Sequence, residues 1–110
     1  MPLIPGNDMI YELRIYRFHP GQKKTFLGGF RKAKSFMKKY GITFVAAWEN
    51  PAREDEFIWI RSFPSLEARE KAVHSYYNST EWLKIVNVLR PTIKRREVRI
   101  MKGLSYSPLR

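Results

Sequence analysis

The chain has 110 residues, of which 44% are hydrophobic and 15% aromatic, a composition typical of one folded domain. Its formal net charge is +11, and it contains no cysteine, which excludes disulfides, thiolate metal sites and cysteine nucleophiles. No apolar run approaches the roughly 20 residues of a membrane span, and the first residues lack the pattern of a signal peptide. We therefore expect a soluble, cytoplasmic protein.

The first strand is predicted over residues 9–18, after an extended N-terminal lead-in over residues 1–8. Its odd positions form one apolar face under the two-residue period of a strand: Met9, Tyr11, Leu13 and Ile15. Its even positions place Ile10, Tyr16 and Phe18 beside a possible Glu12–Arg14 pair. Both faces of this strand are therefore expected to be covered.

A helix is predicted from about Pro20 to Tyr40, followed by Gly41 as the residue that ends it. One buried stripe recurs at helical spacing: Phe26, Phe30, Ala33, Met37 and Tyr40. Gly28 and Gly29 lie within this helix, at a cost of about 1 kcal/mol each relative to alanine. A close approach to another backbone or to a ligand would explain them, and so would a simple tolerated weakness.

Two further strands are predicted over residues 42–50 and 57–63, joined by the short polar connection 51–55. Such a short connection favours an antiparallel hairpin. In the first of these strands, alternation places Phe44, Ala46 and Trp48 on one face.

Two helices and a last strand complete the predicted elements. Ser65 is a good N-cap for a helix that runs to about Tyr77, and Asn78 is the expected cap of the next, with Glu81 three residues on. Pro91 ends that second helix near Leu89. Residues 94–102 read as the last strand, and residues 103–110 as an irregular tail.

The predicted order β-α-β-β-α-β is the ferredoxin-like arrangement, an α+β fold with a four-stranded antiparallel sheet and helices on one face. It forms a single domain over residues 9–110. Both faces of the two central strands are largely apolar, whereas the helices cover only one. Because a large exposed apolar patch usually marks an association surface, we expect a homodimer through the sheet face opposite the helices. The pattern leaves open which alternation faces the helices.

Several segments together resemble the NIPSNAP family, in order and spacing over about residues 9–108. They are Met9 to Tyr16 followed by Pro20-Gly21, then Trp59, Ala68-Arg69-Glu70, Glu81-Trp82 and Ser107-Pro108. The resemblance implies a dimeric α/β-barrel, in which the sheets of two ferredoxin-like chains close into one barrel. It assigns no reaction, although some relatives with this fold are small monooxygenases or haem-degrading enzymes.

That fold implies a pocket between the sheet and the helices, which the aromatic and charged side chains of the central strands would line. The candidate catalytic residues are Glu12, Arg14, Tyr16 and His74, and the candidate ligand-binding residues are Tyr16, Trp48, Trp59, Arg61 and Tyr76. Glu12 is a possible general base tuned by Arg14, although a structural ion pair is the preferred interpretation. Trp59 is either a pocket wall or a core residue.

The sequence indicates no metal site and no cofactor. The two histidines and the absence of cysteine leave no structural zinc site. His74 is a conceivable haem ligand, but an exposed surface position is preferred. Basic side chains cluster in residues 23–39 and 90–102. We interpret them as a solvated surface rather than a nucleic-acid site, because no recognised nucleic-acid-binding motif accompanies them.

These observations support a small protein that binds a small molecule or a protein partner in the pocket. A cofactor-independent or haem-linked monooxygenase is the first alternative. A binder of nucleic acid or of another acidic partner is the second.

Overall fold

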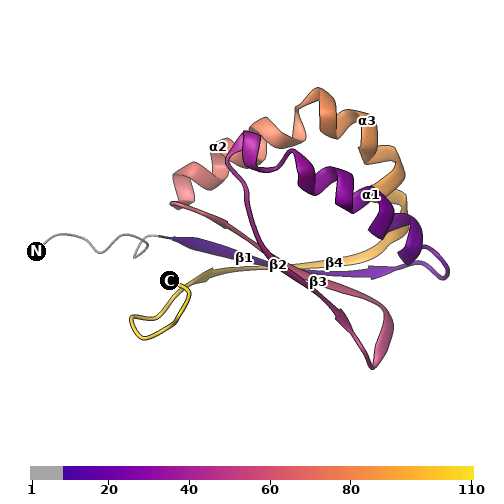
Figure 1. Ribbon diagram of the computed structural model, residues 1–110, viewed down its shortest axis with the longest axis horizontal. Helices are drawn as coiled ribbons and strands as arrows, with labels where there is room; N and C mark the ends of the chain where they lie inside the picture. Colours follow the sequence, from indigo (N-terminus) through magenta and orange to yellow (C-terminus); the bar gives the residue numbers. More distant parts are fainter. Residues whose placement is uncertain (1–8) are drawn as a thin grey trace, which may run out of the picture.

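The computed structural model describes residues 9–110, so the lead-in expected over residues 1–8 lies outside the described residues. A four-stranded antiparallel sheet has the order β2-β3-β1-β4, and three α-helices lie on one side of it (Figure 1). The strands are β1 (Ile10–Phe18), β2 (Thr43–Asn50), β3 (Arg53–Phe63) and β4 (Ile93–Lys102). The helices are α1 (Lys23–Ser35), α2 (Leu66–Tyr77) and α3 (Thr80–Leu89), with short 3₁₀ turns at Lys38–Tyr40 and Arg90–Thr92. The predicted ferredoxin-like fold is confirmed.

Helix α1 is shorter at both ends than the sequence predicted. Gly21 has φ of 75°, a left-handed conformation that a helix cannot continue through, so α1 begins only at Lys23. At the other end Phe36 leaves helical geometry, and its ring stacks on that of Tyr76 with centroids 5.2 Å apart. Packing against α2 therefore overrides helix propensity at this point. Gly41 has φ of 90° and closes the following turn, as predicted.

The two glycines within α1 have different surroundings, which allows a direct test. A Cβ at Gly28 would meet nothing within 4 Å, whereas a Cβ at Gly29 would lie 2.6 Å from Cδ2 of Leu89 on α3. The close approach thus applies to Gly29 alone. We expect Gly28→Ala to raise the free energy of unfolding by about 0.5–1 kcal/mol, and Gly29→Ala to gain less or to lose stability. Urea denaturation of both variants checks this, and equal gains would contradict the close packing of α1 on α3.

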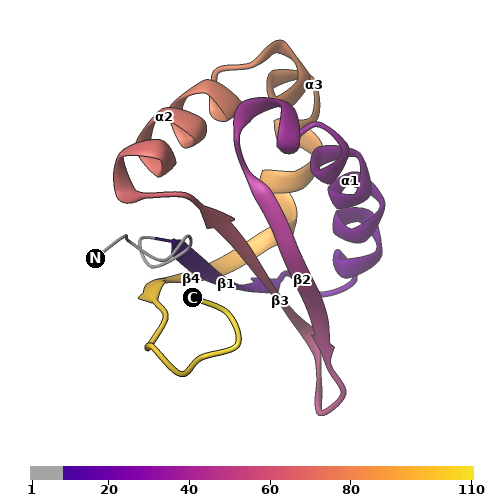
Figure 2. The same cartoon turned by 60° about the vertical axis from the view of Figure 1, so that its left-hand side comes forward.

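The β2–β3 hairpin differs from its prediction in length and in facing. Its turn is confined to residues 51–52, and β3 begins at Arg53 rather than at Phe57, so the hairpin is longer than predicted (Figure 2). An irregularity in register between Phe44 and Ala46 reverses the alternation. Phe44 therefore lies opposite Arg61 and packs on the core, while Trp48 lies opposite Ile58 on the other face. The prediction that residues 44, 46 and 48 share one face is wrong.

The helix caps follow the sequence with one exception. Oγ of Ser65 accepts a hydrogen bond from the backbone N–H of Ala68 at 3.0 Å, as expected for the cap of α2. The expected cap of α3, Asn78, instead ends α2, and Ser79 caps α3 by accepting from the N–H of Trp82 at 3.1 Å.

Within residues 9–110, no helix has the length and apolar character needed to cross a membrane.

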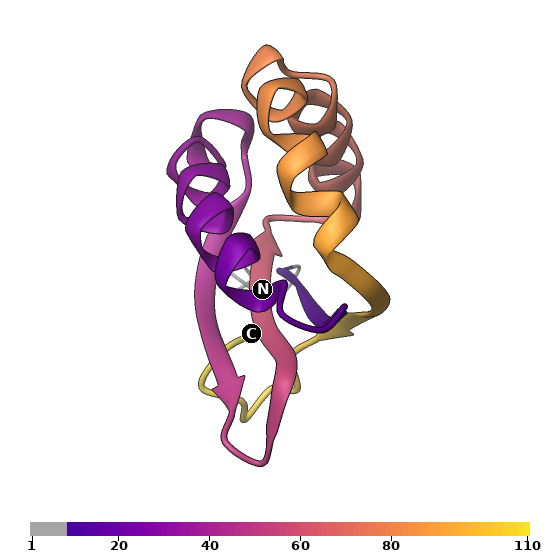
Figure 3. The same ribbon diagram turned by 90° about the vertical axis from the view of Figure 1, so that its right-hand side faces the viewer.

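The structure decides which alternation faces the helices. The even positions of β1 and the odd positions of β3 from Phe57 onward face the helices, so Glu12, Arg14 and Arg61 lie buried in the same layer as the aromatic core. We call the opposite side of the sheet the open face. It carries Leu13, Ile15, Ala46, Trp48, Ile58 and Ile60. The segment 103–110 loops on that side of the sheet, near Tyr11 and Met101 (Figures 1 and 3).

Candidate functional site

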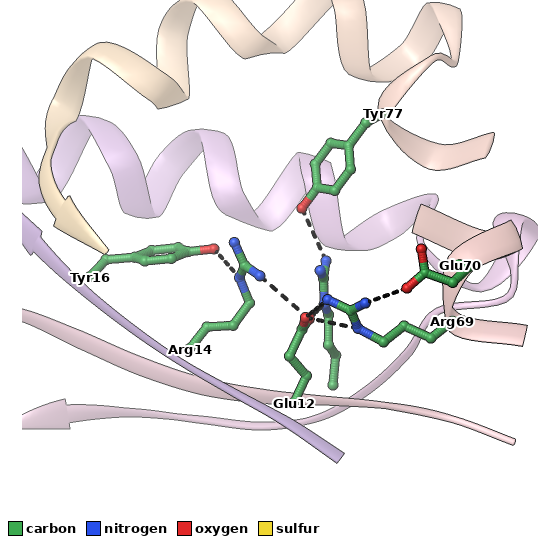
Figure 4. A network of polar contacts seen from close by, with 7 residues as sticks. Glu12, Arg14, Tyr16, Arg69, Glu70 and Tyr77 are labelled. Carbon is green, nitrogen blue, oxygen red and sulfur yellow. Dashed lines mark hydrogen bonds and ion pairs between the residues drawn. The ribbon is translucent and has the colours of Figure 1, made fainter. Parts of the chain in front are cut away.

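Glu12 is the centre of a buried network of charged side chains between the sheet and α2. Its side chain is completely buried, and the sheet register places it directly opposite Arg61. Nε of Arg61 donates to Oε2 of Glu12, and Nη2 of Arg69 donates to Oε1 at 2.7 Å (Figure 4). Nη1 of Arg14 lies 3.4 Å from Oε2. One carboxylate therefore contacts three guanidinium groups.

The arginines keep the Glu12 carboxyl ionised. Burial alone would raise its pKa, but the hydrogen bond and charge of Arg61, together with Arg69 and Arg14, hold the pKa below its ordinary value. A general base needs a pKa near the working pH and a free lone pair. Glu12 meets neither condition, so the geometry favours a structural ion pair under the helices over a catalytic role.

Two tyrosines extend the network away from Glu12. Nε of Arg14 donates to the hydroxyl oxygen of Tyr16 at 2.7 Å, and Nη1 of Arg61 donates to that of Tyr77 at 3.0 Å. The Arg61 guanidinium also lies 5.5 Å from the ring centroid of Trp59, within cation–π range. Arginine suits these positions because its planar group stacks on rings and donates in fixed directions.

A cavity of about 40 Å³ lies beside this network, between the sheet and the helices. A single buried water needs about 10–15 Å³, so there is room for about three waters or one small functional group. Its lining is Arg14, Tyr16, Phe26, Phe30, Ala33, Met37, Trp59, Tyr76, Tyr77, Trp82, Leu89, Arg90, Ile93 and Arg96. Arg90 and Arg96 are exposed, so the cavity reaches the surface where α3 passes into β4.

Trp59 forms part of the cavity wall and is only 2% exposed. Its Nε1–H has no hydrogen-bond partner within residues 9–110. A buried donor without an acceptor costs about 1–3 kcal/mol, so this N–H requires a partner that the described chain does not supply. The cavity provides the space for one.

Tyr76 is held as a neutral phenol at the helix side of the cavity. Its hydroxyl donates to the backbone oxygen of Ala33 at 3.0 Å, which joins α2 to α1. Burial, with Tyr77 nearby, raises the pKa of Tyr76 well above its ordinary value. It therefore acts as a hydrogen-bond donor and a wall rather than as a base.

The predicted site residues divide into three groups. Arg14, Tyr16, Trp59 and Tyr76 line the cavity, and Glu12 and Arg61 lie in the network next to it. Trp48 lies on the open face with 48% exposure, and His74 is exposed on α2; neither lines this cavity. The sequence-based site candidates did not include the network and cavity members Arg69, Tyr77, Arg90 and Arg96, nor the aromatic lining residues Phe26, Phe30 and Trp82.

A separate polar cluster joins the turn after α1 to the start of α3. Glu81 accepts from Nζ of Lys39 at 2.8 Å and from the hydroxyl of Tyr40 at 2.5 Å. The hydrogen bonds from Lys39 and Tyr40 lower the pKa of Glu81 to about 2.

Within the described residues, no group of three or more histidine, aspartate or glutamate side chains is placed to hold a metal ion.

The chain resembles known proteins in both sequence and structure. The NIPSNAP family model matches residues 11–108. A NIPSNAP family protein with unknown function from Agrobacterium tumefaciens has 25% sequence identity and a TM-score of 0.86, with 94% of this chain and 96% of that chain covered. An uncharacterised NIPSNAP-like domain protein from Burkholderia xenovorans has 20% identity and a TM-score of 0.80, with coverages of 93% and 90%.

Enzymes share the fold more distantly. SnoaB, a cofactor-independent oxygenase from Streptomyces nogalater, has 14% identity and a TM-score of 0.70, with 92% of this chain and 98% of that chain covered. At this identity the likeness concerns the fold alone. No curated protein gives a significant match. The family match over nearly the whole chain, together with the shared fold, shows that this chain belongs to the NIPSNAP family.

Proposed function

We propose that this protein is a cytoplasmic homodimer whose chains each bind a small molecule in the cavity between the sheet and the helices. The observation that carries the proposal is the cavity itself. It is lined by aromatic rings, among them that of Trp59, whose N–H has no partner within residues 9–110, and it opens to the surface beside Arg90 and Arg96. A mostly apolar enclosure with a few converging polar groups is the usual form of a small-molecule site.

The dimer is supported by the open face. Leu13 pairs with Ile60 and Ile15 with Ile58 at its centre, and Trp48 beside them is 48% exposed. Contiguous apolar residues of this extent are unfavourable in water, and a second copy related by a two-fold axis would cover them. The ligand cavity lies on the other side of the sheet, so pairing of the open faces leaves its entrance free.

A small monooxygenase is the alternative, favoured by the fold shared with the cofactor-independent oxygenase SnoaB. It has less support from the residues here. Glu12 is fully engaged by arginines, the Tyr76 hydroxyl is occupied by a backbone oxygen, and His74 lies outside the cavity. Ligand binding therefore requires fewer additional assumptions than oxygen chemistry.

Native mass spectrometry of freshly purified protein tests both parts of the proposal at once. We expect an ion at twice the 13.1 kDa chain mass, carrying a discrete additional mass that is released when the protein is denatured. A second spectrum, recorded after the protein is denatured, is the control for covalent modification. A monomer would contradict the dimer, and an additional mass that survives denaturation would show that it is not a bound ligand.

A further inference from the structure

The charges around the cavity do not balance. Glu12 is the carboxylate that Arg14, Arg61 and Arg69 share. Among residues 9–110, only Arg69 has a second acidic partner, Glu70 at 2.8 Å. The side chains of Arg61 and Arg14 are 2% and 9% exposed. A buried guanidinium without a full counter-charge is unfavourable. The layer under the helices therefore holds an excess of positive charge.

Arg14 is the least compensated of the three arginines. Arg61 and Arg69 donate hydrogen bonds directly to Glu12, whereas Arg14 reaches it through one contact of 3.4 Å and otherwise donates to the hydroxyl oxygen of Tyr16. Arg14 also lines the cavity, and neither Arg61 nor Arg69 does so. The uncompensated charge is thus located at the cavity wall.

A second donor lies beside Arg14. Trp59 is its direct cross-strand neighbour on the same face of the sheet, and the buried Trp59 N–H has no acceptor in the part of the chain that the structure describes. Directly opposed side chains in a sheet have Cβ atoms about 5 Å apart. A water would satisfy the N–H but would leave the charge of Arg14 uncompensated. An anionic oxygen would satisfy both.

We propose that the small molecule is an organic anion whose carboxylate occupies the cavity, with Arg14 as its cationic partner and the Trp59 N–H as a second donor. This inference rests on the proposed function and specifies its ligand class. The described residues that line the cavity include three arginines and no acidic side chain. Because the volume of about 40 Å³ accommodates little more than one carboxylate, the rest of the molecule extends toward the entrance.

The entrance fits this class of ligand. Arg90 and Arg96 are exposed there and attract anions. Leu89 and Ile93 line the same side and offer contact to a short apolar chain. The fit is therefore best for a small monocarboxylate with an apolar substituent.

The test is an NMR titration of the indole N–H signals with acetate, propionate and butyrate. Acetamide, propionamide and butyramide serve as uncharged controls of nearly the same shape, at ionic strength held constant with chloride. We expect the Trp59 signal, assigned from its loss in Trp59→Phe, to move saturably with the carboxylates. The signal of Trp48 on the open face is the internal reference and stays in place.

Variants connect the shift to Arg14. Arg14→Gln is expected to weaken carboxylate binding about tenfold or more, as for the loss of a charge-assisted hydrogen bond. Arg31→Gln removes the same charge from an exposed position on α1 that does not line the cavity, and it is expected to change nothing. The spectrum of each variant reports whether it remains folded, and Arg14→Lys provides a charge-conserving second variant with intermediate affinity.

The results distinguish the binding of a small molecule in the cavity from the narrower claim that this molecule is an organic anion. Equal affinity for carboxylates and amides would overturn the anionic class and leave a small-molecule cavity in place. Carboxylate binding that is unchanged in Arg14→Gln, or the lack of any Trp59 shift with every carboxylate, would also overturn the inference. A ligand released in native mass spectrometry that carries no acidic group would also overturn the anionic class, while agreeing with the proposed binding of a small molecule.

Discussion

Glu12→Gln is expected to lower the free energy of unfolding by about 3–5 kcal/mol, the usual loss when one partner of a buried ion pair is removed. The amide keeps the size of the side chain but removes the charge that Arg61, Arg69 and Arg14 share. The buried guanidinium groups then lose their common counter-charge. Urea denaturation followed by circular dichroism measures the difference, at one fixed protein concentration because the stability of a protein that forms the proposed dimer depends on concentration.

Glu67→Gln is the matched control for this variant. Glu67 pairs with Lys71 at 3.5 Å, but both side chains are about four-fifths exposed, at 80% and 78%. We expect this change to alter stability by less than about 1 kcal/mol. If Glu12→Gln were as mild as Glu67→Gln, the buried network would not be a main source of stability.

The pH dependence of stability has the same origin. The pKa of Glu12 is lowered in the folded state, so the unfolded chain takes up the proton first as the pH falls. The stabilisation is complete above the unfolded pKa of about 4.3 and is lost as the pH falls toward the folded value. Glu12→Gln should therefore lose most of its difference from the unmodified protein in strong acid.

Leu13→Asp is expected to break the proposed dimer into monomers. Leu13 lies at the centre of the open face opposite Ile60, and it is only partly buried in the single chain. A carboxylate there would have to be desolvated in a sheet-on-sheet interface, whereas water solvates it in the monomer. Sedimentation velocity should report the 13.1 kDa chain rather than twice that mass.

Leu83→Asp introduces the same charge on the outer surface of α3, where the leucine is 57% exposed. This control should remain a dimer. A dimeric Leu13→Asp with unchanged affinity between subunits would show that the open face is not the interface. Circular dichroism of both variants verifies that the chain is folded.

The order of elements could be predicted because each carries a strong local signal. The two-residue alternation of β1, the Ser65 cap and the left-handed Gly41 all have a single simple interpretation. The predicted element boundaries and strand facing were wrong where tertiary contacts prevail over the local conformational preference of the residues. Phe36 ends α1 by stacking on Tyr76, and the irregularity beside Phe44 depends on its pairing with β3.

The site could be predicted only in part, because the sequence did not decide which face of each central strand lies under the helices. Glu12, Arg14 and Arg61 occupy the helix-facing side, where apolar residues are the usual expectation. Their mutual pairing makes that placement possible, and it depends on strand register, which a single sequence does not give. Arg69 and Tyr77 join the network from α2. Arg69 belongs to a segment that carries the family resemblance, but no local pattern assigned either residue to the site.

The most direct test of the ligand cavity is a titration of protein labelled with ¹³C at the methionine methyl groups. Met37 lines the cavity and is 3% exposed, whereas Met101 lies on the opposite side of the sheet beside the C-terminal segment. We predict that the molecule released in native mass spectrometry, and the small carboxylates, shift the Met37 signal saturably and leave Met101 unchanged. A shift confined to Met101, or none at Met37 for any of these molecules, would contradict binding between the sheet and the helices.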